Sequence, residues 1–157
     1  MFQKIISALK VILLPVLVGA LSGILISGNT DVYDVLIKPP FALPGNLFGI
    51  VWGVLFLLMG IALYLYLNSS VSEMEKREGK TLFFIQLLLN FFWPILFFNA
   101  GQSFLAFLLL IVLFVFIILT TLKFYQARKI SGILLLPYLL YTAYAGYLNF
   151  AIWYLNM

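Results

Sequence analysis

The sequence predicts an all-α membrane protein, a single domain of five transmembrane helices over residues 1–157. The chain is 65% hydrophobic and 9% charged, whereas a soluble domain carries roughly 25% charged residues. The few charges leave uncharged stretches of roughly 20 residues or more, the length that crosses a hydrocarbon core. These stretches lack the apolar–polar alternation of membrane β-strands. The expected helices cover residues 5–27, 45–67, 81–98, 104–124 and 130–154.

The first helix is expected over 5–27. Lys4 and Lys10, followed by an apolar run, also resemble the start of a signal peptide, and 20–22 resembles a cleavage site. The apolar run continues to Ile26, which is longer than a signal peptide needs. The sequence therefore favours a retained helix over a cleaved one.

Residues 28–44 are expected to form a loop at one end of the bundle. The segment 38–44, Lys-Pro-Pro-Phe-Ala-Leu-Pro, carries three prolines, which fix φ, remove backbone donors and prevent a helix before residue 44. Pro44 suits the first turn of the helix over 45–67, and Trp52 lies about two turns inside that helix. The loop is either a lid over a pocket or a membrane-surface turn with an interfacial aromatic residue.

The third and fourth helices are expected around the stretch 81–122, which carries no charge. Residues 99–103, Asn-Ala-Gly-Gln-Ser, are turn-forming and divide it into 81–98 and 104–124. The segment 68–80 before it has mixed charges and is expected to be a polar loop. The fourth helix is nearly all Leu, Phe, Ile and Val, so we expect it to face lipid or a partner subunit.

Polar side chains inside the third helix indicate a candidate site. Gln86, Asn90, Trp93 and Phe97 lie on one helical face. A buried amide costs several kcal/mol unless it finds a partner, so this face either joins another helix or contacts a ligand. The residues alone support both interpretations equally. Pro94 is expected to bend the helix.

The fifth helix, 130–154, carries a comparable face. Its members are polar, aromatic or small and recur at helical spacing: Tyr138, Tyr141, Thr142, Ala145 and Asn149. Phenolic hydroxyls inside a bilayer need acceptors. Pro137 is expected to open or kink this helix, and Trp153 and Tyr154 are typical of an interfacial belt.

Glycines recur with small-xxx-small spacing in the first two helices. They are Gly19 and Gly23 on the first and Gly45, Gly49 and Gly53 on the second. Such spacing lets helix backbones approach closely. The sequence leaves open whether these faces pack within the bundle or between two copies of the chain.

Several kinds of chemistry are disfavoured by composition. The chain has no cysteine and no histidine, which removes thiol catalysis and the commonest metal ligands. No charge lies in the middle of a span, which disfavours a proton relay. We expect no metal site, no cofactor and no nucleic-acid partner.

The placement of cations predicts that the N-terminus lies inside. In this orientation the outer segments carry only Lys38. The inner segments carry eight cations: Lys4, Lys10, Lys76, Arg77, Lys80, Lys123, Arg128 and Lys129. We expect a bacterial cell membrane, with the 28–44 loop on its outer face.

Three blocks of the chain resemble the translocator protein family, also called the TspO/MBR family, tryptophan-rich sensory proteins or peripheral benzodiazepine receptors. The first block is Lys38-Pro39-Pro40-Phe41-Ala42-Leu43-Pro44 with Phe48, Val51, Trp52 and Leu55. The second is Gln86-Leu87-Leu88-Leu89-Asn90-Phe91-Phe92-Trp93 with Leu96-Phe97-Phe98. The third is Leu136-Pro137-Tyr138-Leu139 with Ala143, Leu148-Asn149, Ile152-Trp153 and Leu155-Asn156. With the five spans, the likeness covers essentially the whole chain.

The resemblance implies a five-helix bundle, often a homodimer, with a ligand pocket in one leaflet closed by the first loop. It implies a membrane protein that binds porphyrin-like or other flat hydrophobic molecules as a sensor or translocator in tetrapyrrole or stress responses, with membrane lipid as its other partner. It also implies that Trp52 and Asn90 hydrogen-bond the ligand. The candidate ligand-binding residues are Phe41, Trp52, Gln86, Asn90, Trp93, Tyr138, Tyr141, Ala145 and Asn149.

The chain departs from the family pattern at Phe41 and Tyr141, where the family usually carries tryptophan. Some members break down porphyrin in light, using tryptophans at the positions of Trp52 and Tyr141. The alternative function is therefore a light-dependent porphyrin-degrading enzyme using Trp52. Phe150 and Tyr154 stand in place of the sterol-recognition residues, so tight cholesterol binding is not expected. A channel or carrier has little support, because no inverted repeat is visible.

Overall fold

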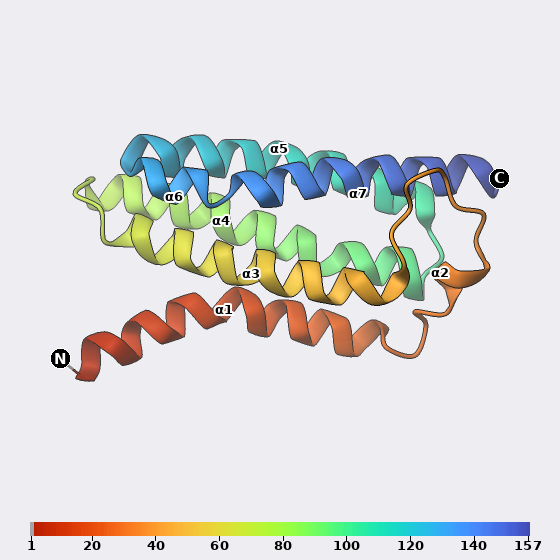
Figure 1. Cartoon of the computed structure of the whole chain (residues 1–157). Coiled ribbons are helices and arrows are strands. Elements are labelled where there is room, and N and C mark those ends of the chain that lie inside the picture. The colour runs from red at the N-terminus through yellow and green to blue at the C-terminus, as the bar shows by residue number, and fades with distance from the viewer. Residues whose placement is uncertain (1) are drawn as a thin grey trace.

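Five long apolar helices make up the structure, a computed structural model that describes residues 2–157 (Figure 1). They are α1 (Phe2–Ile26), α3 (Gly45–Leu67), α4 (Glu73–Pro94), α5 (Ser103–Ala127) and α7 (Leu136–Leu155). Three short elements join them: α2 (Val32–Val35), the π-helix η1 (Ile95–Asn99) and α6 (Lys129–Ile133). With η1 continuing α4 and α6 preceding α7, all five are long and apolar enough to cross a membrane. This confirms the predicted all-α, five-span fold. The first residue of the expected domain lies outside the described part.

The long helices lie side by side, with α1 on one flank of the bundle (Figure 1). α1 packs on α3 and α4, and α5 packs on α4 and α7. The N-terminus and the α3–α4 and α5–α6 connections lie at one end, which we call the N-terminal end. The 28–44 segment with α2, the α4–α5 connection and the C-terminus lie at the other, which we call the lid end.

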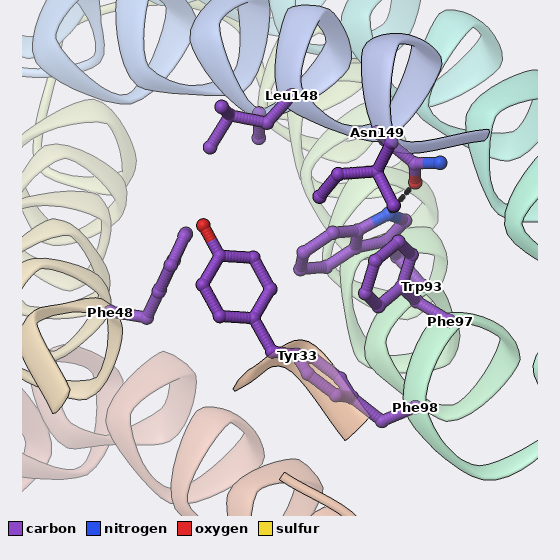
Figure 2. A pocket seen from close by; sticks show the side chains of 9 residues that line it. Tyr33, Phe48, Trp93, Phe97, Phe98, Leu148 and Asn149 are labelled. Atoms are coloured by element: carbon purple, nitrogen blue, oxygen red, sulfur yellow. Dashed lines mark hydrogen bonds between the residues drawn. The ribbon is translucent and has the colours of Figure 1, made fainter. Parts of the chain in front are cut away.

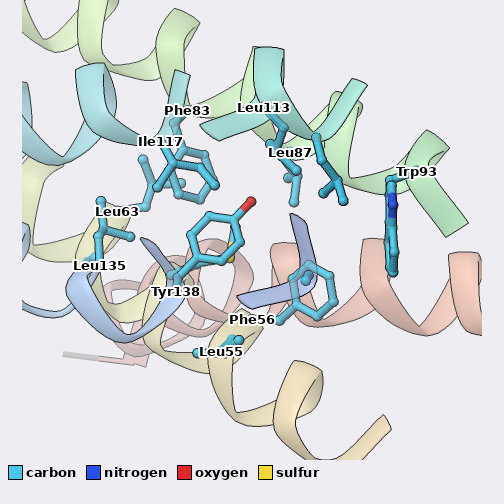
Figure 3. Close-up of a cluster of buried hydrophobic side chains, with 14 of the residues drawn as sticks. Leu55, Phe56, Leu63, Phe83, Leu87, Trp93, Leu113, Ile117, Leu135 and Tyr138 are labelled. Carbon is cyan, nitrogen blue, oxygen red and sulfur yellow. The ribbon is translucent and has the colours of Figure 1, made fainter. Parts of the chain in front are cut away.

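Stacked aromatic side chains fill the bundle interior toward the N-terminal end, and Figure 3 shows part of the surrounding core. Tyr66 and Phe124 stack with ring centroids 4.1 Å apart, and Phe83 stacks on Phe124 at 5.9 Å. All three are fully buried, so they tie α3, α4 and α5 together. α5 buries one face in this core, while Leu108 and Val112 on its other face stay exposed.

The connection between α3 and α4 is shorter than the polar loop expected over 68–80, because α4 begins at Glu73. Ser72 forms a capping box with Glu75. The Ser72 hydroxyl accepts from the Glu75 N–H at 3.2 Å, and the Ser72 N–H donates to the Glu75 carboxylate at 3.0 Å. This pairing satisfies backbone donors that a helix start leaves free. The polar segment is therefore mostly the first turns of α4.

Prolines interrupt both helices that carry the candidate polar faces. The α-helical pattern of α4 ends at Pro94 and continues as η1, as expected where a backbone donor is missing. The fifth span divides into α6, a turn at Leu134 and Leu135, and α7. Pro137 lies in the first turn of α7, where it needs no hydrogen-bond partner. Pro137 therefore opens the long part of the fifth span.

Candidate functional site

A cavity of about 940 Å³ lies between α1, α3 and α4, toward the lid end. Its walls are mostly apolar side chains and glycines of these three helices. α2 and the residues beside it, together with Pro44, contribute its outer part. Ligand sites in proteins commonly measure roughly 300–1,000 Å³ and have apolar walls with a few placed polar groups. This cavity is therefore the candidate functional site.

Glycines create much of this space. A Cβ added at Gly23, Gly49 or Gly53 would meet no other atom within 4 Å, and all three residues line the cavity. Gly19 behaves differently, because a Cβ there would lie 2.2 Å from the ring of Phe56. The small-residue faces of α1 and α3 thus pack closely at Gly19 and leave a hollow beyond it. The sequence had suggested only helix packing for these faces.

Trp52 is the centre of an aromatic cluster at the cavity wall. Its ring lies 5.5 Å from Tyr141, 5.7 Å from Phe56, and 6.1 Å from both Trp93 and Tyr138, measured between centroids. Trp52, Trp93 and Phe56 also line the cavity. Such aromatic pairs hold one another's orientation. The cluster therefore presents a fixed aromatic wall to any occupant.

A buried hydrogen-bond chain joins α4 to α7 behind that wall. The Asn90 side-chain N–H donates to the Tyr138 hydroxyl at 2.8 Å, and this hydroxyl donates to Gln86 Oε1 at 2.7 Å. Gln86 Nε2 is buried and has no partner among the described residues. Asn90 lines the cavity, and none of the hydrogen bonds of the described residues reaches its Oδ1. Gln86 and Tyr138 thus join helices, while Asn90 both joins helices and faces the cavity.

Trp93 links the same two helices nearer the lid end. Its indole N–H donates to Asn149 Oδ1 at 2.9 Å (Figure 2). Asn149 Nδ2 donates to the Ser103 carbonyl at 2.7 Å. Trp93, Ala145 and Asn149 border a separate pocket of about 20 Å³, which has room for about one water molecule. The structure therefore places Ala145 and Asn149 at a minor pocket and not at the 940 Å³ cavity.

Tyr141 and Phe41 occupy different settings from the other candidates. Tyr141 packs edge-on against Trp52, and its hydroxyl is buried without a partner among the described residues. Phe41 is 89% exposed, lies in the 28–44 segment and has a φ of 66°. Phe41 borders neither pocket. Of the sequence candidates, Trp52, Asn90 and Trp93 line the large cavity.

Residues 36–44, which we call the strap, are hydrogen-bonded to the middle of α7 and to Asn156, which follows this helix. The Leu43 N–H donates to the Tyr144 hydroxyl at 3.1 Å, and that hydroxyl donates to the Phe41 carbonyl at 2.8 Å. The Asn156 amide accepts from the Ile37 N–H and donates to its carbonyl, both at 2.9 Å. These bonds hold the strap over the lid end of the bundle.

Tyr33 supports the strap from inside and was not among the sequence candidates. Its hydroxyl donates to the Leu43 carbonyl at 3.0 Å, and its ring packs edge-on against Phe48 at 5.3 Å. Burial, and then the neighbouring Tyr144 and Asp34, raise the pKa of Tyr33, so its hydroxyl stays protonated as a donor. Tyr33 and Phe48 line both pockets. An aromatic residue in the first loop was the only sequence signal for Tyr33.

Comparison with known proteins agrees with this architecture. Residues 11–155 match the model of the TspO/MBR family. The tryptophan-rich protein TspO of Chlorobaculum tepidum is 40% identical over 124 residues, which cover 79% of this chain and 78% of the relative. TspO of Archaeoglobus fulgidus is 41% identical over 76% of each chain, and the human translocator protein is 34% identical over 77% of this chain and 72% of its own. The chain is therefore a membrane protein that belongs to the TspO/MBR family.

Proposed function

We propose that the protein binds porphyrin-like or other flat hydrophobic molecules in the 940 Å³ cavity and acts as a sensor or translocator. The observation that carries this proposal is the cavity itself, with its aromatic wall at Trp52 and the unbonded Oδ1 of Asn90. Apolar walls bind a flat guest by excluding water, and one or two polar atoms orient it. The names of two relatives, a translocator protein and a tryptophan-rich protein, agree with such a role.

In this proposal Trp52 and Trp93 contact the faces of the guest, and Asn90 accepts a hydrogen bond from it. Gln86, Tyr138 and Tyr141 do not contact the guest but hold Asn90 and Trp52 in place. Ala145 and Asn149 keep Trp93 oriented. The strap, including Phe41, closes the outer end. The contacts of each side chain support the role proposed for it.

Titration of the purified protein with protoporphyrin in detergent, followed by tryptophan quenching, tests the proposal. We expect Trp52→Phe and Asn90→Ala each to weaken binding roughly fivefold, which corresponds to about 1 kcal/mol. Trp153→Phe is the matched control, since Trp153 packs on Phe104 at 4.8 Å and borders neither pocket. Unfolding temperatures confirm that each variant folds. Wild-type affinity in both cavity variants would remove the site assignment.

A second candidate function is light-dependent degradation of the bound porphyrin. It is supported by the contact at 5.5 Å between Trp52, which lines the cavity, and the ring of Tyr141, because both side chains are oxidisable. It predicts loss of porphyrin absorbance in light and oxygen that depends on Trp52. Equal loss in wild type and Trp52→Phe would exclude this function and leave binding alone.

We also propose that the N-terminal end lies on the inner side of a bacterial cell membrane and the lid end on the outer side. The eight inner cations against Lys38 support this orientation. Monomer and homodimer are both compatible with the exposed apolar faces of the helices. Cysteine substitution at Ser70 and Gly28, followed by labelling with a membrane-impermeant thiol reagent on whole cells, tests the orientation. Labelling at 28 alone is expected.

A further inference from the structure

The outer mouth of the cavity carries negative charge. Asp31 and Asp34 both line the cavity, and both side chains are exposed. Among the residues that the structure describes, no lysine or arginine lines it. Within the described residues, neither carboxylate forms an ion pair. The formal charges that a guest meets in the cavity are therefore both negative.

One cation lies close to this mouth, and its position is informative. Lys38 Nζ donates to the backbone carbonyl of Asp34 at 3.1 Å and lies 5.0 Å from the centroid of the Tyr33 ring. An ammonium over a tyrosine face at this distance makes a cation–π contact. The mouth thus already accommodates one ammonium group of the chain itself. Two carboxylates and one ammonium leave the mouth with a net negative charge.

The inner part of the cavity also offers an acceptor. Asn90 is 4% exposed and lines the cavity, and one of its side-chain N–H groups donates to the Tyr138 hydroxyl at 2.8 Å. The Tyr138 hydroxyl gives its own proton to Gln86, so it must accept from Asn90. Asn90 Oδ1 is left to accept from a guest. Both ends of the cavity therefore favour a molecule that donates.

A structural role accounts for only one of the two carboxylates. Asp34 Oδ1 lies 3.9 Å from the position of a Cβ at Gly45, the first residue of α3, where a helix start favours a negative charge. Asp31 precedes the four-residue α2 and makes no side-chain capping bond to it. The helix start explains Asp34 in part and leaves Asp31 unexplained.

We infer that the preferred ligands are flat hydrophobic molecules whose polar end carries a positive charge, bound with that end between Asp31, Asp34 and Tyr33 and the apolar body against Trp52. This inference rests on the proposed function of the cavity and adds the charge of its ligand. Anionic molecules of the same shape, including a porphyrin with ionised propionates, still bind but do so more weakly than cationic ones, because the carboxylates at the mouth repel them. The Lys38 ammonium competes with a cationic ligand for the same groups at the mouth, and this competition lowers the affinity for the ligand.

Three anthracene probes of one shape and different charge test the inference: 9-(aminomethyl)anthracene, 9-anthracenemethanol and 9-anthracenecarboxylate. Each is titrated at about pH 7 into the whole protein in non-ionic detergent at low salt, and tryptophan quenching is followed. We expect the cationic probe to bind roughly three- to tenfold more tightly than the neutral one, and the anionic probe to bind least. Added salt should reduce these differences, because the mouth is open to solvent.

Variants then assign the preference to particular charges. Asp31→Asn should weaken the cationic probe roughly threefold, strengthen the anionic probe and leave the neutral probe unchanged. Lys38→Gln should act in the opposite direction and strengthen the cationic probe. Glu73→Gln is the matched control, since Glu73 is a carboxylate at the N-terminal end of the bundle. Each probe is compared between the wild type and the variants, so its partition into detergent is the same on both sides of the comparison and does not affect the result.

The outcomes distinguish a failure of the charge preference from a failure of the proposed function. Saturable binding of all three probes with equal affinity would overturn the charge preference and leave the proposed function standing. Saturable binding of none of them would remove both. Equal weakening of all probes by Asp31→Asn would show a structural effect on the mouth and also overturn the inference. A change confined to the charged probes, with opposite signs in Asp31→Asn and Lys38→Gln, would establish it.

Discussion

Glycines at the two ends of the bundle have opposite effects on packing. Toward the N-terminal end, a Cβ at Gly60 would lie 2.0 Å from the Ile12 carbonyl oxygen, and one at Gly79 would lie 2.3 Å from the Tyr66 ring. Toward the lid end, Cβ atoms at Gly49 and Gly53 would meet nothing within 4 Å. The same residue type therefore allows close helix contact at one end and borders open space at the other.

This difference shows how a chain of nearly uniform hydrophobicity builds a rigid part and a hollow part. Close backbone contact at Gly60 and the stacked rings of Tyr66, Phe83 and Phe124 hold the N-terminal end together. That end can then support helices that leave a cavity between α1, α3 and α4 toward the lid end. The cavity depends on the packed half for its shape and on the strap for its closure.

The largest expected effect comes from adding one methyl group in the packed half. Gly60→Ala places a Cβ against the backbone of Ile12, which cannot move aside as a flexible side chain could. We expect a loss of about 2 kcal/mol or more in unfolding free energy, at the upper part of the range for overpacking. Thermal unfolding in detergent measures it, with Gly53→Ala as the matched control. Equal stability of the two variants would contradict the division into packed and hollow halves.

The next effect is on binding and leaves the fold intact. Gly53→Leu adds a large apolar side chain where no atom lies within 4 Å of the Cβ, so it fills the cavity beside Trp52. We expect at least about a tenfold loss of affinity for protoporphyrin or the neutral anthracene probe, equivalent to about 1.4 kcal/mol. Retention of wild-type affinity would place the ligand somewhere else.

The five-helix fold was predictable because long apolar runs have few alternatives in a membrane. Residues 5–27 and 45–67 were expected as helices and lie within α1 and α3 except at Ser27. The start of α4 was missed, because the capping box of Ser72 and Glu75 converts a polar segment into helix. The Ser72 and Glu75 pair was present in the sequence, but the mixed charges of the segment led to the prediction of a loop.

The cavity was only partly predictable. Trp52, Asn90 and Trp93 stood out as polar or aromatic residues inside apolar helices, and all three line it. The role of Gly49 and Gly53 was not predictable, because spacing alone does not tell a tight contact from a gap. Asp31 and Asp34 were not among the sequence candidates. Their position at the mouth depends on how the 28–44 segment folds back over the bundle.

A smaller effect is expected from loosening the strap. Tyr144→Phe removes the hydroxyl that accepts from the Leu43 N–H and donates to the Phe41 carbonyl. Two exposed or half-buried hydrogen bonds contribute about 1 kcal/mol together, so we expect ligand exchange roughly fivefold faster, with little change in unfolding temperature. Stopped-flow displacement of a bound probe measures the rate. Tyr154→Phe is the control, because the Tyr154 hydroxyl forms no hydrogen bond to the strap.

The smallest expected effect is a change in the unfolding free energy caused by a substitution in the hollow half. Gly49→Ala adds a methyl group into open space and replaces a residue that disfavours helix by roughly 0.5–1 kcal/mol relative to alanine. We therefore expect a gain of about 0.5 kcal/mol in unfolding free energy, opposite in sign to Gly60→Ala, with affinity for a flat ligand slightly reduced. A paired measurement of unfolding and binding checks both signs. A loss of stability would mean that α1 and α3 approach each other at Gly49 more closely than the cavity allows, so the hollow would then close when no ligand is bound.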